Sequence, residues 1–119
     1  MNSGRKSSGG RYKRPKKRKL RDRKSQPRIV KLGNTKVKKV KTRGGSKKIV
    51  NLTNNVANIT GKGQNKKSII KNVLETPSNT FLARQNILVK GTIIETELGK
   101  AKITNRPSQE GNVQAVLIE

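Results

Sequence analysis

The stretch Thr92–Thr104, TIIETELGKAKIT, is the part of this chain that most clearly predicts its fold. Apolar and polar residues alternate on both sides of the turn signal Leu98-Gly99, as they do in two strands that each bury one face. A turn centred there predicts four opposite pairs, namely Ile94 with Ile103, Thr96 with Ala101, Glu95 with Lys102 and Glu97 with Lys100. In this register opposite charges meet on one face and mainly apolar side chains on the other, which favours a β-hairpin.

Short segments rich in β-branched residues continue this pattern over residues 28–119. Strands are predicted at residues 28–32, 36–41, 46–53, 56–60, 68–75, 87–89 and 112–118, between turn signals at 33–34, 42–45, 54–55, 61–65 and 106–111. One short helix is predicted, with Thr76 as its cap, Pro77 at its first position and the residues SNTFLARQ following. Many short strands at close spacing predict an all-β fold, a small β-barrel or sandwich-like domain with one short helix.

The front of the chain has a different composition. The 119 residues hold 30 Lys and Arg against 6 Asp and Glu, a net charge of +24. Residues 1–48 carry 21 basic residues and one acidic residue, whereas residues 49–119 carry 9 and 5. We therefore predict two parts, an extended basic arm over residues 1–27 and a β-barrel-like domain over residues 28–119.

The densest part of this arm is Arg11–Lys24, RYKRPKKRKLRDRK, in which ten of the fourteen residues are basic. Only Tyr12 and Leu20 offer apolar surface there, so the segment cannot build a core. Its charges repel one another unless a polyanion neutralises them, and a short helix over residues 16–24 is expected only then. Nucleic acid is the natural partner, because each neutralised phosphate also releases counterions.

Other interpretations of the arm remain open. It could be a solvated tail, or Lys16–Lys19 could be a nuclear-import signal. Tyr12 could stack on a base or pack on the domain. Aromatic residues make up 2% of the chain, which argues against a base-stacking platform and favours recognition of phosphates and shape in structured RNA. A DNA-compacting protein is an alternative, and a membrane-active peptide would need an apolar face that the arm lacks.

The composition argues against catalysis. The chain has no Cys and no His, which removes disulfides, thiol and imidazole chemistry and most transition-metal sites. The close carboxylates Glu95 and Glu97 each have a lysine partner in the predicted register, so a surface charge ladder is expected there. We predict no enzyme activity, no cofactor, no metal and no small-molecule substrate. No apolar run approaches the ~20 residues that span a bilayer, so no membrane contact is predicted either.

Several motifs resemble one known family. They are RKSSGGR at residues 5–11, TRGG at 42–45, the TPSNTFLARQNILVKG block and the IIETELGKAKITNRPSQEGNVQAVLI ending. Together with the basic run they are similar, over nearly the whole chain, to the small-subunit ribosomal protein "eight-e" family of archaea and eukaryotes, in its compact archaeal form. The resemblance implies a structural protein that binds small-subunit rRNA in the cytoplasmic ribosome, beside neighbouring ribosomal proteins. Homo-oligomerisation is not expected, and a ribosome-assembly factor with the same module is the nearest alternative.

The predicted rRNA-binding residues come from both lines of argument. The TRGG turn alone could be purely structural, or it could let the backbone approach a phosphate closely. Arg84, on the predicted helix, could reach RNA or simply be exposed. The complete set is Arg5, Lys6, Gly9, Gly10, Arg11, Tyr12, Lys13, Arg14, Lys16, Lys17, Arg18, Lys19, Arg21, Arg23, Lys24, Arg28, Arg43, Gly44, Gly45, Lys47, Lys48 and Arg84.

Overall fold

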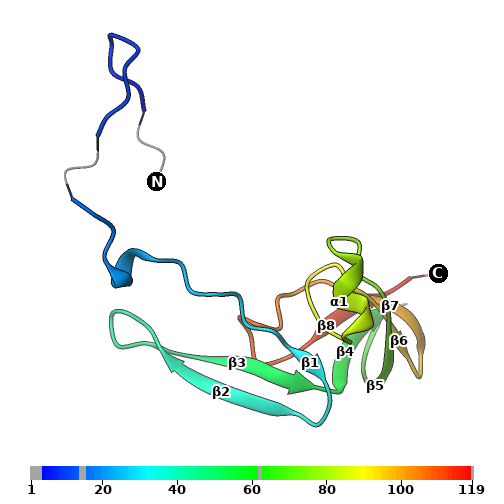
Figure 1. Cartoon of the computed structure of the whole chain (residues 1–119). Coiled ribbons are helices and arrows are strands. Elements are labelled where there is room, and N and C mark those ends of the chain that lie inside the picture. Colours follow the sequence, from blue (N-terminus) through cyan, green and yellow to red (C-terminus); the bar gives the residue numbers. More distant parts are fainter. Residues whose placement is uncertain (1–3, 14–15, 62, 119) are drawn as a thin grey trace.

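A closed β-barrel forms the centre of the structure, a computed structural model that describes residues 4–13, 16–61 and 63–118 (Figure 1). Its strands, in order around the barrel, are β4 (Val56–Gly61), β5 (Gln64–Glu75), β6 (Ile93–Thr96), β7 (Gly99–Ile103) and β8 (Gln114–Leu117). Successive strands are antiparallel, and β8 closes the barrel on β4 in a parallel pair. Closure must be parallel, because the first and last of five alternating strands run in the same direction. The all-β, small-barrel prediction is confirmed.

The barrel interior is filled by alternate residues of its strands. Ile59 on β4, Ile94 on β6 and Ile103 on β7 are fully buried, and burial of each such side chain contributes about 1.5–3 kcal/mol. Alanines occupy other inward positions, where small side chains leave room for the opposite wall. The core comprises Val30, Ala57, Ile59, Ile70, Val73, Leu88, Ile94, Ala101, Ile103, Val113 and Ala115. Val30 and Leu88 join it from outside the barrel strands, held together by the Leu88 N–H, which donates to the Val30 carbonyl at 2.8 Å.

A second sheet, in the order β1-β3-β2, extends from the barrel (Figure 1). Its strands are β1 (Lys31–Leu32), β2 (Lys36–Lys41) and β3 (Lys47–Asn54), and β2 and β3 form a long antiparallel hairpin. The predicted strand over 36–41 and the turns at 33–34 and 42–45 are confirmed. The predicted strand over 28–32 is reduced to two residues, because only Lys31 and Leu32 pair with β3.

The loop of residues 106–111 fastens this hairpin to the barrel. The Asn51 N–H donates to the carbonyls of Pro107 and Glu110, both at 3.2 Å. The Asn51 side chain is buried. In the amide orientation that satisfies both of its ends, its nitrogen donates to the Gly111 carbonyl at 3.1 Å and its oxygen accepts the Asn112 N–H at 3.3 Å. The loop therefore takes up the part of the β3 edge that the short β1 leaves free.

The helix α1 (Thr80–Arg84) begins later than predicted, at the cap Asn79. The Asn79 Oδ1 accepts the Phe81 N–H at 3.0 Å. Thr76 is instead buried beside Thr92, and its carbonyl accepts the Asn79 N–H at 3.1 Å. Pro77 therefore occupies a turn before the helix, which its fixed φ favours as well as it favours a first helical position. The predicted Thr76 cap is wrong.

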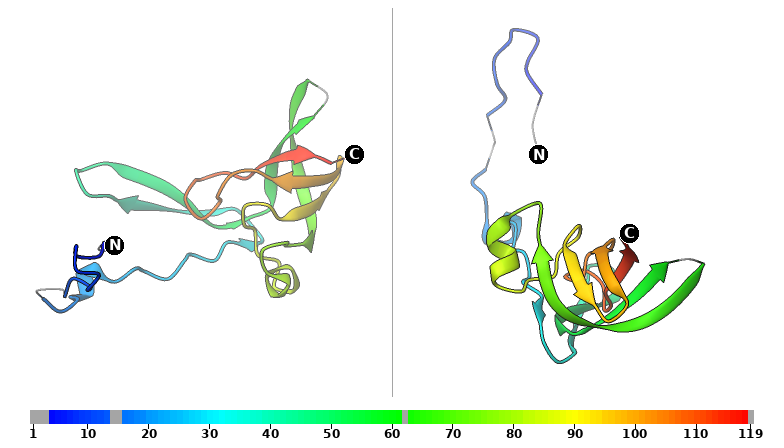
Figure 2. Two further views of the ribbon diagram at one scale, coloured as in Figure 1. Left: turned by 90° about the horizontal axis from the view of Figure 1, so that it is seen from above. Right: turned by 90° about the vertical axis from the view of Figure 1, so that its right-hand side faces the viewer.

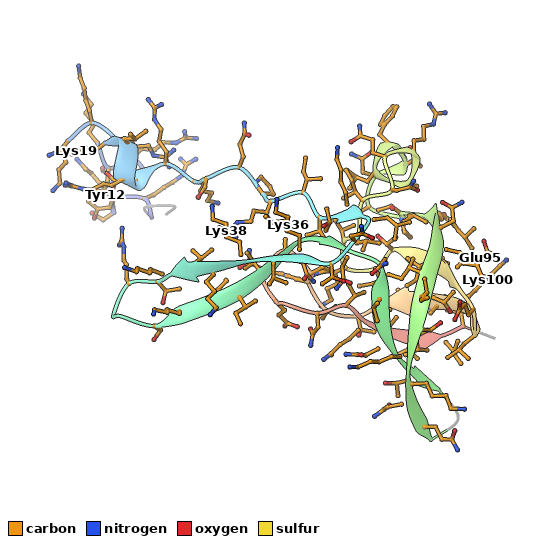
Figure 3. All side chains as sticks on the ribbon, turned by 90° about the horizontal axis from the view of Figure 1, so that it is seen from below. Tyr12, Lys19, Lys36, Lys38, Glu95 and Lys100 are labelled. Carbon is orange, nitrogen blue, oxygen red and sulfur yellow. The ribbon has the colours of Figure 1, made fainter. Side chains whose placement is uncertain are left out.

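The predicted register of the β6–β7 hairpin is also wrong. Ile94 lies opposite Ala101 and Glu95 opposite Lys100, so the turn is centred on Glu97-Leu98 (Figure 3). A two-residue turn centred on Leu98-Gly99 would place Leu98 at a strained positive φ or need glycine in its place. The observed turn leaves only Gly99 at positive φ, 124°, and the Thr96 Oγ1 donates to its carbonyl at 2.8 Å.

Other element boundaries differ from the sequence expectation. The segment 87–89 makes only an isolated bridge, between Ile87 and Lys31, and follows Asn86 at a positive φ of 52°. β5 begins at Gln64, before the predicted residue 68, so the loop around Gly63 is shorter than expected. β8 begins at Gln114, two residues later than predicted. In the arm, a short 3-10 turn forms over Leu20–Asp22. The helix over 16–24 was expected only once phosphates neutralise the arm, so it stays a prediction.

Candidate nucleic-acid interface

The RKSSGGR motif forms a compact loop at the outer end of the arm. Arg5 and Arg11 make an antiparallel bridge, and the Lys6 N–H donates to the Gly10 carbonyl at 2.9 Å. The Gly9 N–H returns to the Lys6 carbonyl at 2.9 Å, with Gly9 at a φ of 81°. The Arg5 guanidinium donates to the Gly9 carbonyl at 3.2 Å. These backbone bonds bring three basic residues, Arg5, Lys6 and Arg11, together on one turn.

Tyr12 lies beside this loop rather than on the β domain. The Lys6 Nζ is 5.7 Å from the centroid of the Tyr12 ring, which is within reach of a cation–π contact. Tyr12 is 57% exposed and lies far from the barrel (Figure 3). Of the two interpretations of Tyr12, packing on the domain is therefore wrong.

The middle of the arm turns at Leu20–Asp22. The Asp22 carboxylate, the only acidic group in residues 1–48, accepts the Lys19 N–H at 3.3 Å. Leu20 is 81% exposed, so the turn has no apolar support. The predicted residues Lys13, Lys16, Lys17, Arg18, Lys19, Arg21, Arg23, Lys24 and Arg28 are all exposed, and Arg14 lies outside the described residues. The arm therefore presents its charges to solvent along its described length.

The TRGG motif forms the tip of the β2–β3 hairpin. The N–H and the Oγ1 of Thr42 both donate to the Ser46 carbonyl at 2.8 Å. Gly44 and Gly45 adopt φ values of 87° and 84°, which L side chains rarely adopt. A tight turn thus accounts for both glycines, and it leaves Arg43 exposed at the tip.

The two lysines after this tip have different surroundings. Lys47 is exposed and lies directly opposite Lys41. Lys48 is half-buried, and its Nζ donates to the Gln109 side chain in the loop that fastens the hairpin. Lys47 is free to meet a partner, whereas Lys48 also holds the hairpin to the body.

The β1-β3-β2 sheet carries basic residues that were left out of the predicted site. Lys36, Lys38, Lys39 and Lys41 of β2 and Lys31 of β1 are all exposed. Their signal was in the sequence, since KVKKVK has four lysines in six residues, but the segment was interpreted only as a strand. Like charges directly opposite, such as Lys41 and Lys47, destabilise a sheet unless a partner neutralises them.

The fold brings these residues together as two basic projections on one side of the barrel. The arm and the β2–β3 hairpin leave the barrel in the same general direction (Figures 1 and 2). They give the molecule its elongated shape, with principal extents of 59 × 33 × 30 Å. We call these two elements the basic prongs. Arg84 belongs to neither prong; it is exposed on α1, with its guanidinium 6.0 Å from the Phe81 ring centroid.

Residues 4–13, 16–61 and 63–118 contain no group of three or more His, Cys, Asp or Glu side chains placed to hold a metal ion. Among the same residues, no helix has the length and apolar character needed to cross a membrane.

Comparison with known proteins gives matches along the chain. A family model described as ribosomal protein S8e matches residues 1–118. The small ribosomal subunit protein eS8 of Halorubrum lacusprofundi is 40% identical over 117 residues, covering 98% of this chain and 95% of that protein. The eS8 protein of Methanococcus aeolicus is 43% identical over 121 residues, covering 98% and 93%. That of Nanoarchaeum equitans is 44% identical over 96 residues, covering 79% and 76%.

These matches confirm the resemblance that the RKSSGGR, TRGG and C-terminal motifs indicated. With a matching family model and relatives of about the same length, this chain belongs to the ribosomal protein S8e family.

Proposed function

We propose that this protein is a structural constituent of the small ribosomal subunit that binds folded rRNA through its two basic prongs. In this proposal residues 1–27 are the rRNA-binding arm and residues 28–119 are the β-barrel-like domain. The protein acts as a single copy in the cytoplasmic ribosome, in contact with rRNA and neighbouring ribosomal proteins. The observation that carries the proposal is the exposure of both prongs on one side of the barrel.

Electrostatics supports a polyanion as the partner of the prongs. Residues 1–48, which contain the arm and most of the hairpin, have a net charge of +20, and the single acid there is engaged by the backbone of the turn at Lys19. Phosphates that settle between the prongs relieve this repulsion, and their released counterions favour binding further. By neutralising these phosphates, the protein can hold together RNA segments that would otherwise repel one another.

The side-chain chemistry of the prongs favours folded RNA over unstacked bases. Tyr12 is the one aromatic residue of residues 1–48, so successive bases have no platform to stack on. Arginines supply bidentate contacts to phosphate, and lysines supply point charges. The loop at Arg5–Arg11 and the turn at Arg43 both expose their arginines to solvent. Recognition of shape and phosphate in structured RNA fits this composition.

Sedimentation tests this proposal most simply. A tagged chain expressed in an archaeal host is expected to co-migrate with mature small subunits through a high-salt wash. Presence only on precursor particles would identify an assembly factor instead. Release from ribosomal particles, together with equal binding to duplex DNA and rRNA in a competition assay, would identify a DNA-compacting protein.

A further inference from the structure

A polar groove lies on the outer surface of the barrel, outside both prongs. It has a volume of about 460 Å³ and crosses the parallel pair β4–β8 and the first half of β5. Its polar lining includes Asn58, Thr60, Asn65, Lys66, Lys67 and Gln114. The register sets five of these residues on one face, because Asn58 lies opposite both Lys67 and Gln114 while Thr60 lies opposite Asn65. Lys66 lies opposite Ile59 and therefore belongs to the other face of the hairpin. The β4 residues Ala57 and Ile59 point into the core.

The lining has the chemistry of a sugar–phosphate site. Lys67 supplies charge for a phosphate, and the amides and the hydroxyl can donate to phosphate oxygens or bond a ribose 2′-hydroxyl. The lining formed by the described residues includes no acidic and no aromatic side chain. An acidic group would repel RNA, and an aromatic one would indicate base stacking, so the groove suits the RNA backbone rather than its bases.

The groove is separate from the basic prongs. The β4–β5 hairpin that carries Lys66 and Lys67 projects away from the arm (Figures 2 and 3). The Glu95–Lys100 pair lies on a different hairpin of the barrel. An RNA segment in the groove would therefore approach the protein from another direction than the segment on the prongs.

We propose that this groove is a second RNA-binding site, which takes the sugar–phosphate backbone of an rRNA segment distinct from the one bound by the prongs. The protein then joins two rRNA segments across its barrel. This inference rests on the proposed function, since it takes rRNA as the partner. An acidic segment of a neighbouring protein is the competing occupant. A carboxylate would use only a few of the amide and hydroxyl groups of the groove, whereas a ribose and its phosphate together can bond more of them.

Footprinting of small-subunit rRNA by hydroxyl radicals, with the full chain bound, tests the inference. The wild-type protein is expected to protect at least two separate rRNA segments. The Lys67→Gln variant is expected to weaken protection of one segment and to leave the other unchanged. Its log–log salt slope should fall in magnitude by about 0.7–0.9, the value for one lost phosphate contact. The matched control Lys71→Gln removes the same charge from an exposed residue outside the groove and should leave both protections unchanged.

Each other outcome has a definite meaning. If the groove variant keeps every protection, or loses all of them in the same proportion as the control, the groove is not an RNA site. If it behaves as wild type on naked rRNA but is lost from subunits that contain the other proteins, the groove binds a protein and the inference is overturned. In all these cases the wild-type footprint remains, whereas failure of the proposed function would leave the wild type without one.

Discussion

Gly111 shows how a single position controls the attachment of a prong. A Cβ at Gly111 would lie 2.8 Å from the Ile49 Cγ2 on β3, closer than side chains pack in folded proteins. The same residue offers its carbonyl to the Asn51 amide, so the loop and the hairpin meet there, beside an Ile49 side chain that is 48% exposed. The size of Gly111 therefore decides how closely the loop packs on β3.

We predict that Gly111→Ala destabilises the protein by about 1 kcal/mol, the low end of the cost of an extra methyl group, because the half-exposed Ile49 side chain can shift in part. Gly33→Ala is the matched control, because a Cβ there meets its nearest neighbour, the Thr53 Cβ, at 3.9 Å. Urea unfolding of both variants gives the comparison. Equal midpoints for the two would show that the loop contact at Ile49 does not hold the hairpin.

At the level of elements, the β6–β7 hairpin separates what a sequence pattern determines from what it does not. Alternation in TIIETELGKAKIT correctly predicts that Ile94, Ala101 and Ile103 face inward. It does not fix the register, since a shift of two residues leaves every side chain on the same face. The φ that each turn residue can adopt decides the register, and Leu98 disfavours the positive φ that the other turn needs. The prediction of Thr76 as the helix cap was wrong because the local pattern was again ambiguous. Pro77 suits a turn as well as it suits the first position of a helix.

The β2 strand carries the prediction at this scale. Replacing Lys36, Lys38, Lys39 and Lys41 with Gln should leave the fold intact, because all four are exposed, and should relieve the repulsion between Lys41 and Lys47. The thermal midpoint should stay the same or rise. The log–log salt slope of rRNA binding should fall in magnitude by about 2.8–3.6 if each lysine meets one phosphate.

A matched control removes the same charge from the barrel. Gln at Lys71, Lys90, Lys100 and Lys102, which are also exposed, should change the slope by much less. Equal slopes for the two variants would mean that net charge, and not the position of the hairpin, governs binding.

For the whole molecule, the sequence predicted the parts better than their arrangement. The barrel was predicted correctly because its strands alternate, whereas the division between arm and domain was inferred from contiguous charge and stays a prediction. The hairpin lysines were missed because a strand pattern already accounted for KVKKVK. That the arm and the hairpin project on the same side depends on how Val30 packs on Leu88 and how the 106–111 loop meets β3. Such contacts join residues far apart in the chain, so no local pattern could have predicted them.

The central claim is that both prongs neutralise phosphates of folded rRNA, and the salt dependence of binding tests it most directly. Affinity of the full chain for a small-subunit rRNA fragment would be measured by filter binding over a range of salt concentrations. With about six to ten phosphates contacted, affinity should fall by about 10³ to 10⁵ between about 50 and 200 mM salt. A fall of less than about tenfold over this range would correspond to at most one or two phosphates and would contradict the account.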